Sequence, residues 1–219
     1  MADYKKADFW QLKARKEGYP ARSVYKLKEI DEKFNIFNIH AKTPEKGAVK
    51  RILDIGAAPG SWSLYVLRKL ASGNSAKGFL AAADLSPLSR EFDNDPKNKG
   101  LFDGDNFFFI QGDVTTEEVR NTILSKGLYG VIISDVAPGT TGSRLVDAAR
   151  SLELSQTVIS YVENALVPGG NLVLKVFQGD GIDELLKHVK TLFKTVKTFK
   201  PQACRGDSME TYFIGLEKK

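Results

Sequence analysis

The sequence predicts an α/β protein built on a doubly wound parallel sheet with helices on both faces. Apolar, strand-like runs alternate with helix-like runs five times between residues 51 and 195, and a glycine turn joins the first strand to its helix. Aspartates stand at the ends of later strands, namely Asp84, Asp113 and Asp135. Because such sheets bind ligands at the carboxyl ends of their strands, this pattern also predicts a ligand site.

The composition fits one large domain or two small ones. The chain has 219 residues, of which 42% are hydrophobic, enough for a substantial core. No apolar run approaches the roughly 18 residues of a membrane-spanning helix, and residues 1–6 lack the apolar core of a secretion signal. The single cysteine, Cys204, suits a reducing compartment. We therefore expect a cytoplasmic protein without a membrane partner, or a mitochondrial or nuclear one if the source is eukaryotic.

Positive charge is concentrated at both ends of the chain. Residues 1–30 hold eight Lys/Arg against four Asp/Glu, and residues 187–219 hold eight against three, whereas the middle is acidic. This distribution suggests that both ends approach a polyanion. The alternative is that the lysines only keep the terminal helices soluble.

The first third of the chain predicts two helices before the sheet begins. A helix over residues 5–17 should end at Gly18 and Pro20, and a second should run from residue 21 or 22 to 34. Arg22 and Lys26 lie one turn apart on that second helix. Residues 38–50 are predicted to be a polar linker, followed by a buried strand at 52–55 and the turn.

The later elements follow from periodicity and breaker residues. A polar stretch, 86–106, is predicted to be an exposed insert. Pro168, Gly169 and Gly170 should end the helix before them. The predicted strands are 78–85, 106–113, 129–135, 171–177, 196–200 and 211–217, and the predicted helices are 117–125, 148–166 and 183–195.

The glycine turn, Gly56-Ala-Ala-Pro-Gly60, predicts a nucleoside site, although alone it could be a simple strand–helix turn. Asp84, at the next strand tip, is placed to accept hydrogen bonds from ribose hydroxyls, and Asp113 from the amine of a base. Pro59 occupies a position where a pyrophosphate needs backbone donors, and bulky Trp62 opens the helix. These features argue against a dinucleotide as the ligand, and therefore against an NAD-dependent oxidoreductase as the function.

Lys175 lies within an apolar strand, Asn171-Leu-Val-Leu-Lys-Val-Phe177, and is a candidate base. Burial favours the neutral amine, which can take a proton. The alternative is a lysine that extends its ammonium to solvent. Asp135, in Ser134-Asp-Val-Ala-Pro138, is placed at a neighbouring strand tip and completes a plausible proton-handling pair.

Five segments of the chain form a recognisable set of motifs. They are Ala21-Arg-Ser-Val-Tyr-Lys-Leu-Lys-Glu-Ile30, Asp54-Ile-Gly-Ala-Ala-Pro-Gly-Ser-Trp62, Ser134–Pro138, Leu174-Lys-Val-Phe-Gln-Gly179 and Ser208-Met-Glu-Thr-Tyr212. Together they resemble the FtsJ/RrmJ group of S-adenosylmethionine-dependent RNA ribose 2′-O-methyltransferases. The resemblance implies a Rossmann-like methyltransferase fold: a mostly parallel seven-stranded sheet with an antiparallel last strand, in one domain over 1–219. Residues 1–37 would form a basic helical extension that helps to bind RNA.

The resemblance also assigns roles to residues. A catalytic Lys-Asp-Lys-Glu tetrad falls on Lys26, Asp135, Lys175 and Glu210. The cofactor would be S-adenosylmethionine, and no metal site is predicted. Its predicted contacts are Gly56, Pro59, Gly60, Ser61, Trp62, Asp84, Asp113 and Asp135. Within the tetrad, Lys175 would be the base, kept neutral by the like charge of Lys26, while Asp135 orients it and Glu210 holds Lys26 or the ribose.

The expected substrate is a uridine of large-subunit ribosomal RNA, methylated by a monomeric enzyme. Lys175-Val-Phe-Gln-Gly179 is similar to the ribosomal branch, whereas Ser61 is similar to enzymes of the tRNA anticodon loop, which remain the alternative. A non-catalytic RNA-binding module is a more distant rival. The basic side chains expected to hold RNA are Lys5, Lys6, Lys13, Arg15, Lys16, Arg22 and Lys28 near one end and Lys197, Lys200 and Arg205 near the other.

Overall fold

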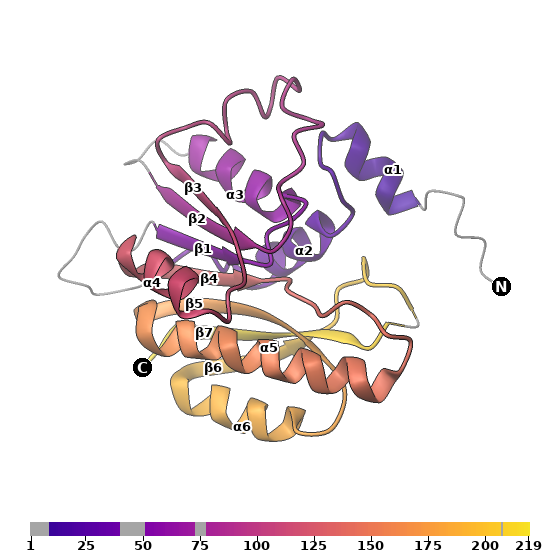
Figure 1. Cartoon of the computed structure of the whole chain (residues 1–219), viewed down its shortest axis with the longest axis vertical. Coiled ribbons are helices and arrows are strands. Elements are labelled where there is room, and N and C mark those ends of the chain that lie inside the picture. Colours follow the sequence, from indigo (N-terminus) through magenta and orange to yellow (C-terminus); the bar gives the residue numbers. More distant parts are fainter. Residues whose placement is uncertain (1–8, 40–50, 73–77, 207) are drawn as a thin grey trace.

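A computed structural model describes residues 9–39, 51–72, 78–206 and 208–219, and these form one sheet of seven strands between two layers of helices (Figure 1). The strand order is β3-β2-β1-β4-β5-β7-β6. Neighbouring strands from β3 to β5 pair in parallel, whereas β7 is antiparallel to both β5 and β6. The predicted fold, including the antiparallel last strand, is confirmed.

The strands form where the sequence is almost continuously apolar, as expected of a parallel sheet that is covered on both faces. Every residue of β4 is buried, and β1 is exposed only in part at Arg51. The strands are β1 (Arg51–Ile55), β2 (Phe79–Asp84), β3 (Phe107–Gln111), β4 (Tyr129–Ser134), β5 (Leu166–Phe177), β6 (Phe193–Phe199) and β7 (Glu210–Lys218).

The helices pack on the sheet through apolar stripes of helical period, such as Leu185 and Val189 of α6. One core cluster joins the sheet to α4, α5 and α6, and a second joins its other face to α1, α2 and α3. The helices are α1 (Phe9–Lys16), α2 (Val24–Phe34), α3 (Ser61–Ser72), α4 (Glu117–Ser125), α5 (Arg144–Ala165) and α6 (Ile182–Leu192). None of these described helices is long and apolar enough to cross a membrane.

Several predicted boundaries were wrong because tertiary contacts override local pattern. Helix α5 begins at Arg144 rather than 148, where the Asp147 carboxylate accepts hydrogen bonds from the backbone and side chain of Thr141. Strand β5 begins at Leu166, so Pro168–Gly170 lies within it. Helix α6 ends at Leu192 because Phe193 already pairs with Lys218 of β7.

The insert at 86–106 has no helix or strand, but the expectation that it is simply exposed was wrong. Asn98 and Phe102 are buried. The Asn98 side-chain oxygen accepts hydrogen bonds from Nε and Nη2 of Arg68 in α3, at 2.9 and 2.7 Å, and its nitrogen donates to the Gly18 carbonyl at 2.8 Å. The insert therefore ties α3 to the turn between α1 and α2.

Part of the predicted N-terminal region lies outside the described residues. This applies to Lys5 and Lys6, to the first residues of the helix predicted over 5–17, and to most of the linker predicted over 38–50. The second predicted helix is confirmed, although its regular part begins at Val24.

Candidate active site

The turn after β1 is shaped by close contact with the loop after β4. Gly56 has a φ of +82°, and a Cβ placed on it would lie 2.5 Å from the Val136 Cα. The amides of Gly56 and Ala57 donate to the Ala83 carbonyl at the end of β2, at 2.9 and 3.2 Å. Only glycine fits this position, which brings the tips of β1, β2 and β4 together.

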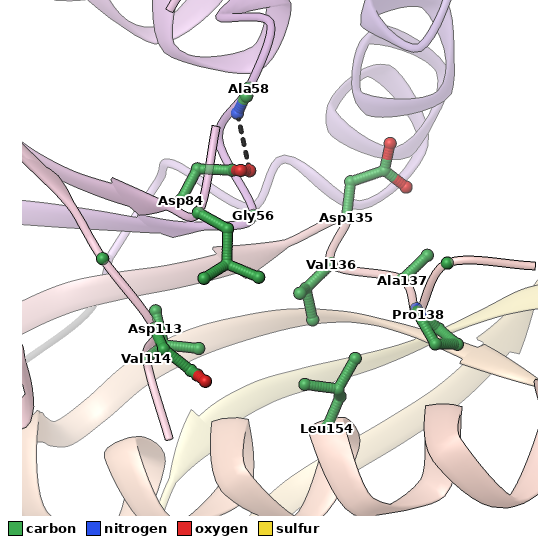
Figure 2. A pocket seen from close by; sticks show the side chains of 13 residues that line it. Gly56, Ala58, Asp84, Asp113, Val114, Asp135, Val136, Ala137, Pro138 and Leu154 are labelled. Carbon is green, nitrogen blue, oxygen red and sulfur yellow. Dashed lines mark hydrogen bonds between the residues drawn. The ribbon is translucent and has the colours of Figure 1, made fainter. Parts of the chain in front are cut away.

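A cavity of about 330 Å³ lies at the carboxyl ends of these strands (Figure 2). Asp84, Asp113 and Asp135 all contribute to its wall, as the sequence predicted. Its volume is within the range of small-molecule sites. The lining residues are Gly56, Ala58, Asp84, Leu85, Gly112, Asp113, Val114, Asp135, Val136, Ala137, Pro138, Gly139 and Leu154.

Two of the three acids are held in place by local hydrogen bonds. Asp84 Oδ2 accepts from the Ala58 amide at 2.9 Å, the dashed line in Figure 2, and its Oδ1 accepts from the Ser86 amide at 2.8 Å. Asp113 Oδ1 accepts from the amide and hydroxyl of Thr115, which lowers the pKa of Asp113. Both side chains are therefore fixed acceptors at the cavity.

The predicted tetrad is assembled from four separate elements: Lys26 from α2, Asp135 after β4, Lys175 from β5 and Glu210 from β7. Lys26 Nζ lies 2.7 Å from Glu210 Oε2 and 4.0 Å from Asp135 Oδ1. Lys175 Nζ lies 3.4 Å from Asp135 Oδ1 and 3.6 Å from Glu210 Oε2. Each lysine thus contacts both carboxylates.

These charges are almost fully buried and balance one another. Burial raises the pKa of Asp135, but Lys175 and Lys26 outweigh it and hold that pKa below its usual value. Burial also raises the pKa of Glu210, but the charge of Lys26 and, to a smaller extent, that of Lys175 lower it overall. Burial lowers the pKa of Lys26, but Asp135 and Glu210 raise it overall. Lys26 is therefore a fixed cation beside Lys175.

Tyr212 is a member of this cluster that sequence reasoning did not assign to the site. Its hydroxyl, fully buried, donates to Asp135 Oδ1 at 2.6 Å. It lies in Ser208–Tyr212, two residues beyond Glu210 on the same face of β7, and this period-two spacing was a usable signal. Leu154 of α5 also lines the cavity, and no sequence signal pointed to it.

Four of the predicted cofactor residues, Pro59, Gly60, Ser61 and Trp62, do not line the cavity. The Ser61 hydroxyl accepts from the Ala21 amide at 2.8 Å, and Trp62 Nε1 donates to the Ser23 carbonyl at 2.8 Å. These side chains therefore join the glycine turn to the segment that leads into α2 and Lys26. Their direct contact with a cofactor stays a prediction.

Asp54, in β1 beneath the turn, is a further buried acid. Ser63 Oγ donates to its Oδ2 at 2.7 Å, whereas its Oδ1 has no hydrogen-bond partner among the described residues. Burial raises the pKa of Asp54 to about 7, and the charges of Asp135 and Asp84 add to the effect.

A family model of FtsJ-like methyltransferases matches residues 19–218. The chain belongs to this family. It is accordingly a methyltransferase, and S-adenosylmethionine is its methyl donor. The carboxyl ends of β2, β3 and β4 carry the three acids of the cavity, and β7 adds Glu210 and Tyr212 to the neighbouring tetrad cluster.

Curated relatives match this methyltransferase over nearly its whole length. A "ribosomal RNA large subunit methyltransferase E" of Treponema denticola is 41% identical over 99% of this chain and 97% of its own. The protein of that name in Borreliella afzelii is 40% identical over 95% and 96%. Among solved structures, a ribosomal RNA methyltransferase of Plasmodium falciparum has the same fold, with a TM-score of 0.70 and 24% identity over 91% of this chain and 98% of its own.

Proposed function

We propose that this enzyme methylates a ribose 2′-hydroxyl in RNA, and that its substrate is a uridine of large-subunit ribosomal RNA. The observation that carries the proposal is the position of Lys175. Its Nζ lies 3.4 Å from the carboxylate of Asp135, which itself lines the proposed cofactor cavity. A group that can take a proton therefore lies at the edge of the cavity from which the methyl is delivered. The names of the relatives support the ribosomal substrate.

The residues of the cavity fit S-adenosylmethionine. Asp84 would accept hydrogen bonds from ribose hydroxyls and Asp113 from the adenine amine, since both are ordered carboxylates at successive strand tips. Asp135, held ionised by two lysines, would face the positive end of the cofactor. Gly56 and the four residues of the turn outside the cavity wall, Pro59 to Trp62, complete the proposed cofactor set.

The proposed mechanism follows from the arrangement of the tetrad. S-adenosylmethionine supplies an activated methyl on a sulfonium, with a neutral thioether as leaving group. The enzyme has to align the ribose and remove the proton of its 2′-hydroxyl. Lys175 pairs with Asp135 and Glu210 as an ammonium, so it would first release a proton to solvent and then, as the neutral amine, accept the proton of the hydroxyl. Asp135 orients its Nζ, and Lys26, paired with Glu210 at 2.7 Å, disfavours a second positive charge at the same place.

We further propose that the chain acts as a single monomeric domain whose helices α1 and α2, within residues 1–37, contact RNA. Lys13 and Lys16 lie in the last turn of α1. Arg15 and Lys28 are paired with Glu91 and Glu17, so they contribute less free charge. Trp10 packs against Tyr25, with ring centroids 5.0 Å apart, which favours a structural role over base stacking.

An enzyme that methylates ribosomal RNA would work in the cytoplasm of a bacterial cell.

Methyl transfer to defined RNAs tests the proposal. Labelled S-adenosylmethionine is offered with large ribosomal subunits and, in parallel, with tRNA. Label should enter ribosomal RNA, and mapping should place it on one ribose 2′-oxygen. Label in tRNA alone would replace the proposal by the tRNA alternative. Because phosphate contacts release counterions, binding should weaken steeply as salt is added.

A further inference from the structure

The first residues of the insert between β2 and β3 are joined to the glycine turn by hydrogen bonds. The Ser86 amide donates to Asp84 Oδ1 at 2.8 Å. Three residues further on, the Ser89 amide donates to the Pro59 carbonyl at 2.9 Å. From the turn itself, the Ala58 amide donates to Asp84 Oδ2 at 2.9 Å (Figure 2). Asp84 is therefore held between the insert and the turn.

The far end of the insert returns to the same turn through Phe102. Gly60 has a φ of +109°, and a Cβ placed on it would lie 2.9 Å from Phe102 Cζ and 3.6 Å from Leu88 Cδ2. The Phe102 side chain is buried and packs on Phe107 of β3, with ring centroids 5.1 Å apart. Because Gly60 has no side chain, the ring lies directly against the backbone of the turn.

The two ends of the insert are also joined to each other beside this ring. Arg90 Nη2 donates to both carboxylate oxygens of Asp103, at 2.8 and 2.9 Å. The Arg90 guanidinium lies 5.8 Å from the centroid of the Phe102 ring. An exposed ion pair adds little stability, but this one links the end that carries Leu88 to the end that carries Phe102. The insert therefore contacts the turn from both of its ends as one closed loop.

These contacts lie outside the cofactor cavity. Leu88, Ser89 and Phe102 do not belong to the described wall of that cavity, whereas Ala58 and Asp84 do. The insert would therefore affect a ligand in the cavity through the turn and Asp84. A binding site gains affinity when its contact residues are held in the binding geometry before the ligand arrives.

We infer that the insert is a positioning element for the cofactor, and that Phe102, packed on Gly60, holds the glycine turn and Asp84 in the geometry that binds S-adenosylmethionine. The inference rests on the proposed cofactor cavity and adds positioning residues that lie outside it. Loss of Phe102 should weaken cofactor binding without slowing methyl transfer from the bound cofactor. The reason is that the tetrad comes from α2, β5, β7 and the end of β4, whereas Phe102 packs on β3 and the turn.

Calorimetry with S-adenosylhomocysteine on the full chain tests the inference without an RNA acceptor. Phe102→Ala should weaken binding by about tenfold, and Phe102→Leu, which keeps apolar atoms against Gly60, by about threefold. The same two substitutions at Phe193 are the matched controls. Phe193 is buried in the core cluster on the other face of the sheet, so its variants should lose stability and keep the affinity of the wild type. Circular dichroism shows that each variant is folded.

Kinetics separate positioning from catalysis. In methyl transfer to large ribosomal subunits, Phe102→Leu should raise the KM for S-adenosylmethionine and keep kcat within about twofold of the wild type. Three results would each overturn the inference: unchanged affinity in both Phe102 variants, an equal loss of affinity in the Phe193 variants, or a fall in kcat at unchanged KM.

Asp84→Asn distinguishes the inference from the proposals on which it rests. This variant should bind S-adenosylhomocysteine about tenfold more weakly, because Asp84 is the proposed acceptor for the ribose hydroxyls. Wild-type affinity in Asp84→Asn would overturn the proposed cavity and the inference with it. If no RNA accepts a methyl group, the proposed function fails, whereas the calorimetric comparison of the Phe102 and Phe193 variants still decides the inference.

Discussion

The ammonium nitrogen of Lys175 lies 3.4 Å from two oxygens of Asp135, its carboxylate Oδ1 and its backbone carbonyl. The parallel pairing of β4 with β5 produces this contact, because Ser134 is in register with Leu174 and the next residues extend side by side. Two residues 40 apart in the chain are thus brought together by backbone pairing alone. The contact orients the proposed base at the tip of the sheet.

Lys175→Met should abolish most of the turnover while leaving the cofactor bound. The substitution keeps the apolar stem in its buried strand and removes the amine that accepts the proton, so kcat should fall by roughly 10²–10⁴-fold. Single-turnover methyl transfer gives the rate, and calorimetry with S-adenosylhomocysteine gives the affinity. Lys187→Met on α6 is the control. Near-normal turnover in Lys175→Met would remove the residue from the mechanism.

Lys26 and Glu210 should be strongly coupled in stability. Removing one partner leaves a buried charge, so Lys26→Met and Glu210→Leu should each lower the free energy of unfolding by roughly 3 kcal/mol, and the double variant by clearly less than their sum. Chemical denaturation provides the double-mutant cycle. The pair Lys28–Glu17 is the matched control, since it is as short, at 2.6 Å, but more exposed and should couple by less than about 1 kcal/mol.

Glu210→Gln should reduce turnover less than Lys175→Met does. The glutamine retains an acceptor for Lys26, and Asp135 still orients Lys175. Comparing kcat of the two variants under single-turnover conditions checks this order. A larger loss in Glu210→Gln would make the glutamate, rather than the lysine, the leading candidate for the proton acceptor.

The alternation of strands and helices was sufficient to predict the sheet and the edge where its acids meet. It could not predict that α5 begins at Arg144, because the first turn is held by hydrogen bonds from a loop residue, Thr141, to the carboxylate of Asp147. Nor could it find a cavity of about 260 Å³ beside the tetrad, whose wall combines Arg22 and Arg205 from distant segments of the chain. Asn98 lies in a polar stretch whose composition is typical of an exposed loop. In the structure it is buried, because its hydrogen bonds with Arg68 and Gly18 hold it against the N-terminal helices.

Asn98→Ala should therefore destabilise the protein despite lying in an insert. The change leaves the Arg68 guanidinium without two acceptor contacts and removes one of the two side-chain donors to the Gly18 carbonyl, at a cost of roughly 2–3 kcal/mol in the free energy of unfolding. Denaturant titration measures it. Lys97→Ala, exposed and adjacent, should change stability by less than about 0.5 kcal/mol. Equal stabilities of the two variants would show that the insert does not brace the N-terminal helices.

Asp54 should make the stability of the protein depend on pH near neutrality. Its folded pKa of about 7 lies above the ordinary value of 3.8, because the carboxyl is fully buried. The folded state thus keeps a proton that the unfolded state has released, and stability from this group falls as pH rises from about 4 to about 7. Above that range the penalty is complete and constant.

Asp54→Asn removes this titration, so the variant should gain stability relative to the wild type between pH 5 and pH 8, by roughly 2–3 kcal/mol at about 1.4 kcal/mol per pH unit. Denaturant unfolding of both proteins at the two pH values measures the change. Asp113→Asn is the control: hydrogen bonds from Thr115 lower the pKa of Asp113, so this acid is ionised in both states throughout the range and the difference from wild type should be flat. An equally flat difference for Asp54→Asn would mean that the carboxyl beneath the glycine turn is already ionised at pH 5.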